Sequence, residues 1–106
     1  MPVFVFDSGT RFPYDTSLDY CSLGYFVPIR RAHAHMRDAL DALQARPQAE
    51  VDAKRAALRR VRDRFVFRAN SSFERPSAAE YIYEQVCAAL REPHARPTWS
   101  PDACKV

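Results

Sequence analysis

The chain has 106 residues, the length of one domain, and its 16 basic and 13 acidic residues give a net charge of +3. Sixteen alanines make up much of the 47% hydrophobic content, and only 23 residues are Leu, Ile, Val or Phe. This composition predicts a thin core that gains stability from a partner or from self-association. No apolar run is long enough to span a bilayer, so we expect a protein without a membrane partner.

The first residues and the cysteines predict a cytoplasmic location. Met1 to Asp7 lack the basic region and the long apolar stretch of a signal peptide. The three cysteines are odd in number and widely spaced, at positions 21, 87 and 104. This spacing is more typical of reduced thiols than of a disulfide framework.

The N-terminal third predicts at least one strand. The apolar run of residues 3–6 ends at Asp7, Ser8 and Gly9, a pattern typical of a short buried strand followed by a turn. Residues 9–19 lack periodicity and are expected to form a loop. Residues 20–27 are rich in aromatics but contain Gly24, and they fit either a bulged second strand or the approach to a helix.

Two helices are predicted to follow as a tight antiparallel hairpin. The first begins at Pro28, and its apolar positions alternate in steps of four and three at Ile29, His33, Met36, Leu40 and Leu43. Pro47 then opens a second helix, whose shared apolar face consists of Val51, Leu58, Val61 and Phe65. The run of residues 65–67 is either the end of this helix or a short strand paired with residues 3–6.

A third helix and a tail complete the prediction. Ser77 and Glu80 have the spacing of a capping box, and the apolar face that follows consists of Ala79, Ile82, Tyr83, Val86 and Leu90. Prolines 93, 97 and 101 predict that residues 93–106 are an extended or disordered tail after a single domain of residues 1–92. The fold class is therefore α+β and helix-rich, with a short N-terminal strand packed against the hairpin and the third helix.

The second helix carries the strongest functional signal, because the excess positive charge is concentrated there. Seven basic residues and one aspartate give residues 54–68 a net charge of +6, which leaves −3 for the rest of the chain. Such a field attracts phosphates or acidic protein surfaces. The candidate binding residues are Lys54, Arg55, Arg59, Arg60, Arg62, Arg64 and Arg68.

Two interpretations of this basic segment stay open. The arginines can flank the core with their charged ends in water, or they can dock on an acidic partner. Helical periodicity places Arg55, Arg59 and Arg62 in one stripe and Arg60, Arg64 and Arg68 in another. The segment lacks the signatures of a helix-turn-helix, a zinc finger or an RNA-recognition sheet, so backbone contact is favoured over base reading.

The remaining motifs give weaker functional signals. Asp7, at the end of the first strand, resembles a catalytic carboxylate over only a few letters, and a capped glycine turn explains it better. His33 and His35 point apart on a helix and cannot share a metal with Cys21, and Cys87 and His94 lack further ligands. No cofactor is expected, because the chain has no phosphate-binding glycine loop.

Three functional hypotheses follow from these features. The first is a non-catalytic protein that binds a nucleic-acid backbone, free or within a ribonucleoprotein, through the basic helix. The second is a regulator or inhibitor that binds an acidic protein surface and uses Tyr81 and Trp99 as anchors, although Trp99 can instead cover the core. The third is an enzyme that uses Asp7.

Overall fold

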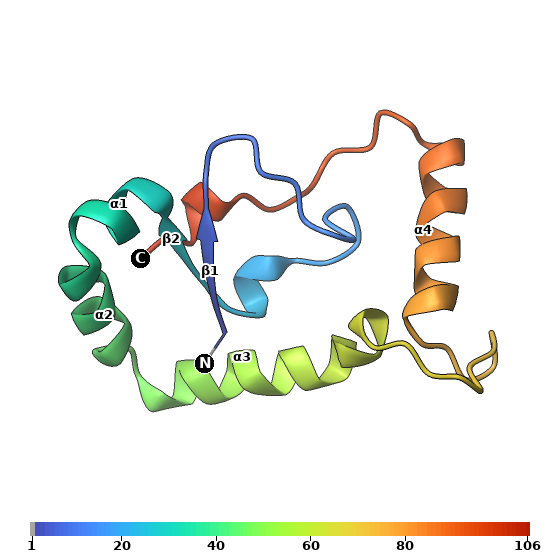
Figure 1. The fold of residues 1–106 in the computed structure, drawn as a ribbon, viewed down its shortest axis with the longest axis horizontal. Coiled ribbons are helices and arrows are strands. Elements are labelled where there is room, and N and C mark those ends of the chain that lie inside the picture. Colours follow the sequence, from blue (N-terminus) through green and yellow to red (C-terminus); the bar gives the residue numbers. More distant parts are fainter. Residues whose placement is uncertain (1) are drawn as a thin grey trace.

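The computed structural model describes residues 2–106, and its secondary structure confirms the helix-rich α+β class (Figure 1). Within these residues it contains a two-stranded sheet, four α-helices and three short 3₁₀ helices. The strands are β1 (Val3–Phe6) and β2 (Tyr25–Pro28). The helices are α1 (Ile29–Ala34), α2 (Met36–Gln44), α3 (Gln48–Val61) and α4 (Ala78–Arg91), and the 3₁₀ helices are η1 (Tyr20–Ser22), η2 (Arg62–Phe65) and η3 (Pro101–Ala103). No helix in this part of the chain combines the length and hydropathy that a membrane span requires.

The two strands run parallel, with Val3 opposite Tyr25 and Phe6 opposite Pro28. The aromatic segment of residues 20–27 is thus divided between η1 and a second strand. Gly24 lies where the strands approach, because a Cβ there would be 2.7 Å from the ring of Phe4 and 2.8 Å from the carbonyl oxygen of Pro2. Glycine is therefore required for this approach.

An aromatic cluster packs on one face of the sheet. It joins Phe4 of β1 and Phe26 of β2 to Phe12, Tyr20 and Trp99. Phe26 is fully buried, and the ring of Trp99 lies 5.5 Å from its ring, measured between centroids. The Trp99 indole nitrogen also donates a hydrogen bond of 2.9 Å to the carbonyl oxygen of Asp15. Trp99 therefore covers the core, which was one of its two predicted roles.

The C-terminal segment returns to the sheet, although the sequence predicted it to lie outside the domain. Residues after α4 run in an extended path back across the molecule (Figure 1). Lys105 then forms a parallel bridge with Phe26, and the Val106 nitrogen donates a hydrogen bond of 2.8 Å to the Phe26 carbonyl oxygen. The last residues thus extend the sheet beyond β2.

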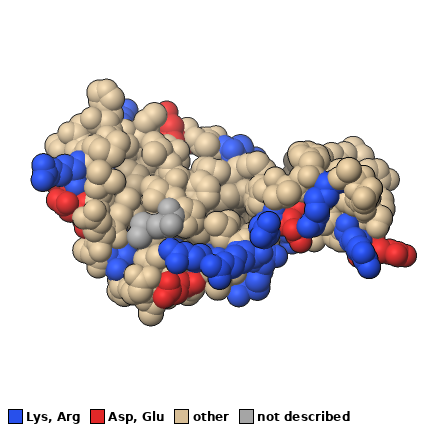
Figure 2. Space-filling model, turned by 60° about the horizontal axis from the view of Figure 1, so that its bottom comes forward, with Lys and Arg blue, Asp and Glu red and all other residues tan. Residues whose placement is uncertain are grey.

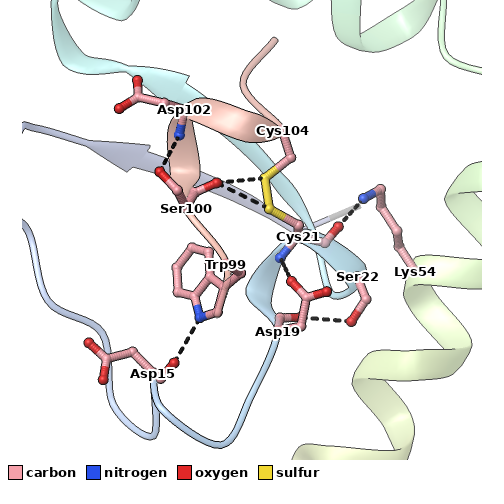
Figure 3. The surroundings of a disulfide bond; sticks show 9 residues. All are labelled: Asp15, Asp19, Cys21, Ser22, Lys54, Trp99, Ser100, Asp102 and Cys104. Atoms are coloured by element: carbon pink, nitrogen blue, oxygen red, sulfur yellow. Dashed lines mark hydrogen bonds between the residues drawn. A yellow bond between two sulfur atoms is a disulfide. The ribbon is translucent and has the colours of Figure 1, made fainter. Parts of the chain in front are cut away.

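A disulfide between Cys21 and Cys104 fixes this arrangement (Figure 3). It joins η1 to the end of η3 across 83 residues of sequence. The prediction of three reduced thiols is therefore wrong for two of them, and only Cys87 is free among the described residues. Sequence spacing could not reveal this bond, because the fold alone brings the two residues together.

The first predicted helix is divided into α1 and α2, with a break at His35. Of the predicted core residues only Leu43 is buried, and Ala32 and Ala39, which were not predicted to face the core, are buried with it against Tyr25 and Val27. Three of the predicted core residues, Ile29, Met36 and Leu40, are about half exposed, and His33 is exposed as well. The break lets small alanines approach the sheet closely while the chain bends around β2.

The predicted antiparallel hairpin is not formed, because α2 and α3 meet at a corner instead of lying side by side (Figure 1). Val51 of α3 is buried with α1 and α2, whereas Leu58 and Val61 pack on the aromatic cluster. The helix gives way to η2 at Arg62, and residues 65–67 are exposed. Of the two alternatives for this run, the helix end is correct, since β1 pairs with β2.

Helix α4 begins at the predicted capping box, in which Ser77 and Glu80 each bind the other's backbone. It packs mainly on η2 and stands apart from the sheet (Figure 1). The radius of gyration is 15.7 Å, whereas a compact chain of this length has about 13 Å. The molecule is therefore an open arrangement, with α4 as an arm.

The disulfide gives a first testable prediction. The Cys21→Ser/Cys104→Ser double variant should lose about 2–4 kcal/mol of unfolding free energy, because the bond closes a long loop in the unfolded chain. Urea denaturation measures this loss, with Cys87→Ser as the matched control that leaves the bond intact. A reductant should lower the stability of the native chain but leave the double variant unchanged; equal denaturation midpoints for both chains in oxidising buffer would contradict the prediction.

The capping box gives a second prediction, on pH. Hydrogen bonds from Ser71 and from Ser77 lower the pKa of Glu80 from its ordinary value of 4.5. Glu80 thus stabilises the fold above that value, and its contribution disappears as the pH falls through the lowered pKa. Unfolding free energy measured across the acidic range should fall less steeply in Glu80→Gln than in the native chain. If the unfolding free energies of the two chains change with pH at the same slope, the Glu80 carboxylate has the same pKa in the folded and unfolded states, and the prediction is wrong.

Candidate functional site

The basic residues of α3 form a band on the surface (Figure 2). Four of them are exposed along α3 and the start of η2, namely Arg55, Arg59, Arg60 and Arg62. Arg55 and Arg62 are seven residues apart, which corresponds to about 10 Å along a helix axis. We call these four residues the arginine band.

The arginine band has little internal neutralisation. Asp52 lies 4.0 Å from Arg55, at the limit of an ion pair, and both side chains are about half exposed. Within residues 2–106, Arg59, Arg60 and Arg62 make no ion pair and no side-chain hydrogen bond. Their guanidinium groups are available to an external anion, and each has a planar set of donors that matches phosphate or carboxylate.

Lys54 lies on the same helix but is bound within the protein. Its ammonium group donates a hydrogen bond to the carbonyl oxygen of Cys21 (Figure 3) and lies 4.8 Å from the centre of the Tyr25 ring. Tyr25 is buried, and this burial raises the pKa of its hydroxyl. Lys54 therefore attaches α3 to the loop that carries the disulfide.

Arg64 and Arg68 are bound within the protein as well, which interrupts the second predicted stripe. The Arg64 guanidinium lies 5.1 Å from the centre of the Tyr81 ring and donates a hydrogen bond of 3.3 Å to Ser17. Arg68 forms an ion pair of 2.9 Å with Asp63 and a hydrogen bond to the Pro76 carbonyl oxygen. Both residues join η2 to its neighbours, so only Arg60 of that stripe is free.

The two predicted protein anchors lie at the core. Tyr81 and Trp99 are both half-buried, and both pack against the buried core that extends from Phe26 to Tyr14 and Leu18. The helical period of α4 predicted an exposed Tyr81, but the helix turns this side toward η2. Its predicted apolar face is exposed instead, with Ile82, Val86 and Leu90 open to solvent.

Asp7 takes part in the turn after β1. Its carboxylate accepts a hydrogen bond of 2.7 Å from the Ser8 backbone, and Gly9 has the positive φ of 81° that such a turn requires. The described residues contain no cluster of three or more potential metal ligands, either here or elsewhere. The hypothesis of an enzyme that uses Asp7 therefore stays a prediction, and no such cluster supports it.

A hollow of about 510 Å³ lies between the loop of residues 11–17 and the end of α4. It contains Arg91 and Arg96, but also Glu92 and the ion pair between Arg11 and Asp15. The Arg11 guanidinium donates to Asp15 and lowers the pKa of its carboxyl group. With charges of both signs, this hollow indicates no single class of ligand.

An apolar groove is the feature that sequence reasoning missed. It has a volume of about 320 Å³ and lies between η2 and α4. Phe65, Ile82 and Val86 line it, together with Pro13 and Tyr14. The exposed run of residues 65–67 was its signal in the sequence, but the partner element could not be identified there.

Comparison with known proteins gives no assignment for this surface. Neither the protein-family models, nor the curated proteins, nor the solved structures include a match to this chain.

Proposed function

We propose that this protein is a non-catalytic binding protein that docks its arginine band on a nucleic-acid backbone. The observation that carries the proposal is the presence of three exposed arginines on α3 and η2 without an internal carboxylate partner. These residues, Arg59, Arg60 and Arg62, together with Arg55, concentrate exposed positive charge along α3 and the start of η2. When arginines neutralise the phosphates of a nucleic acid, the counterions condensed on it are released, and this release favours binding to such a surface.

The geometry favours backbone contact over base reading. Helix α3 is anchored on its inner side by Val51, Leu58 and Val61 and by Lys54, so its outer side alone meets a partner. The outer residues besides the arginines are mainly alanines, with Asp52 and with Gln48, whose amide nitrogen donates a hydrogen bond to Asp52, and they offer no aromatic group for a base. We therefore expect little dependence on nucleotide sequence.

A regulator that binds an acidic protein is the second candidate. The apolar groove beside η2 favours it, because a groove lined by Phe65, Ile82 and Val86 can receive an apolar side chain. Arg64 also lines the groove and would face a carboxylate of the partner. Such a partner would require the groove as well as the arginines, whereas nucleic acid requires the arginines alone.

A triple variant tests the nucleic-acid proposal. Arg55→Ala/Arg59→Ala/Arg62→Ala should bind arbitrary DNA and RNA at least tenfold more weakly than the native chain in low salt, because three phosphate contacts are lost. The salt dependence should change as well. With four contacts the native log K against log salt has a slope of about −3 to −4, and the variant a slope near −1.

A charge-matched control separates local contact from net charge. Arg30→Ala/Arg37→Ala/Arg91→Ala removes three exposed arginines from other helices and should bind almost as the native chain does. Gel shift and fluorescence anisotropy at several salt concentrations measure both variants. If the native chain retains neither nucleic acid at low salt, or if both variants lose affinity equally, the proposal is overturned.

A further inference from the structure

Helix α4 presents a wide apolar stripe to solvent. Its members recur at the helical period, and Ile82, Val86 and Leu90 are 44%, 53% and 79% exposed. Ala79 and Tyr83 lie on the same side. Eight of the 13 exposed large hydrophobic residues described lie between positions 65 and 90, from the end of η2 through the following loop to α4. Contiguous apolar surface of this kind marks an interaction site.

The stripe is continuous with the apolar groove. Ile82 and Val86 belong to both, and Phe65 and Phe67 form the opposite wall. At the other edge of the stripe, the rings of Phe73 and Tyr83 stack edge to face at 5.5 Å. Helix α4 is thus an apolar platform, and it is held by the capping box and by a hydrogen bond from Gln85 to Thr16.

The distribution of charge on α4 fits a second copy of this chain. Its three charged residues are Glu80, Glu84 and Arg91, and they lie about 120–160° from Val86 at the centre of the stripe, at 100° per residue. A two-fold axis through the stripe would bring no like charges together, and an isologous contact requires this self-complementarity. A strongly charged partner would instead be attracted to the arginine band on α3.

The side-chain sizes fit the same symmetry. If Val86 lies on the axis of an antiparallel pair, Ile82 lies level with Leu90 of the second copy, and the two Val86 side chains meet. Branched aliphatic residues of similar size then face one another along the whole stripe. The apolar residues on α1 and α2 do not fit a second copy equally well, because Arg30 and Arg37 lie exposed among them.

We propose that α4 is a self-association surface, on which the α4 of a second copy of this chain packs antiparallel through Ile82, Val86 and Leu90. The proposal does not depend on nucleic-acid binding. It explains why an open monomer with a thin core carries a well-capped helix whose larger apolar residues face outward. The second copy supplies the apolar surface that this chain lacks.

Val86→Glu tests the proposal by placing a charge at the centre of the contact. Sedimentation velocity is measured at protein concentrations of about 1–100 µM. At the higher concentrations the native chain should have twice the monomer mass of 12.2 kDa. The variant should remain at 12.2 kDa, with its dissociation constant raised at least tenfold, because burying an unpaired charge is costly. Val86 is 53% exposed, so the variant should keep the native circular dichroism and unfolding midpoint.

Glu84→Lys is the matched control, since it changes the charge of the same helix on the opposite side and should dimerise as the native chain does. The measurements are made on nuclease-treated protein in about 0.5 M salt, which screens bridging by nucleic acid through the arginines. A native chain that is monomeric throughout, or a dimer that tolerates Val86→Glu, would overturn the proposal. Failure of nucleic-acid binding would leave it unaffected.

Disulfide crosslinking between two copies tests the antiparallel arrangement. In a Cys87→Ser background, Val86→Cys places a thiol at the two-fold axis, where it should form an intermolecular disulfide under mild oxidation. Glu84→Cys in the same background places the thiol away from the contact and should not. A covalent dimer on a non-reducing gel for the first variant alone supports the proposal, and equal crosslinking of both variants contradicts it.

Discussion

The structure depends on the attachment of its C-terminal segment to the aromatic face of the sheet. A two-stranded sheet is marginally stable in isolation, and here only four residues in each strand pair. Trp99 packs on Phe26, the disulfide joins Cys104 to Cys21, and Val106 bonds to the carbonyl oxygen of Phe26. Together these contacts fix the sheet, and they also position α3, because Lys54 binds the carbonyl oxygen of Cys21.

Local patterns predicted the elements better than their packing. The existence of a strand at residues 3–6 and of the capping box at Ser77 was predicted correctly, because both are encoded by neighbours in sequence. The strand was also predicted to be buried, but Val3 and Val5 are exposed. The buried faces of α1, α2 and α4 were not predicted correctly. These helices turn alanines inward, such as Ala32, Ala39 and Ala78, and leave larger residues outside. Hydrophobic periodicity assumes that the larger residues are buried, so it identifies the wrong side when a close approach favours alanine.

At the candidate site, too, the sequence predicted what depends on neighbouring residues and missed what depends on contacts between distant ones. The sequence located the positive charge on α3, but it did not separate the free cations from those bound within the protein. Arg64 is held by Ser17 and Tyr81, and Lys54 by Cys21, and all three partners are distant in sequence. Four cations stay free because the helix surface at their positions faces no other element, namely Arg55, Arg59, Arg60 and Arg62. Only the fold could make this distinction.

The charged and apolar surfaces lie on different elements, and this separation allows both to act together. The arginine band follows α3 and the start of η2, whereas the apolar stripe lies on α4, which stands apart from the sheet. In the proposed dimer the α4 helices meet, and each copy keeps its arginine band exposed. When the arginine band of one copy has bound a long polyanion, the band of the second copy meets the same polyanion at a raised effective concentration. Self-association would then strengthen a modest electrostatic contact of four arginines without any additional contact residue.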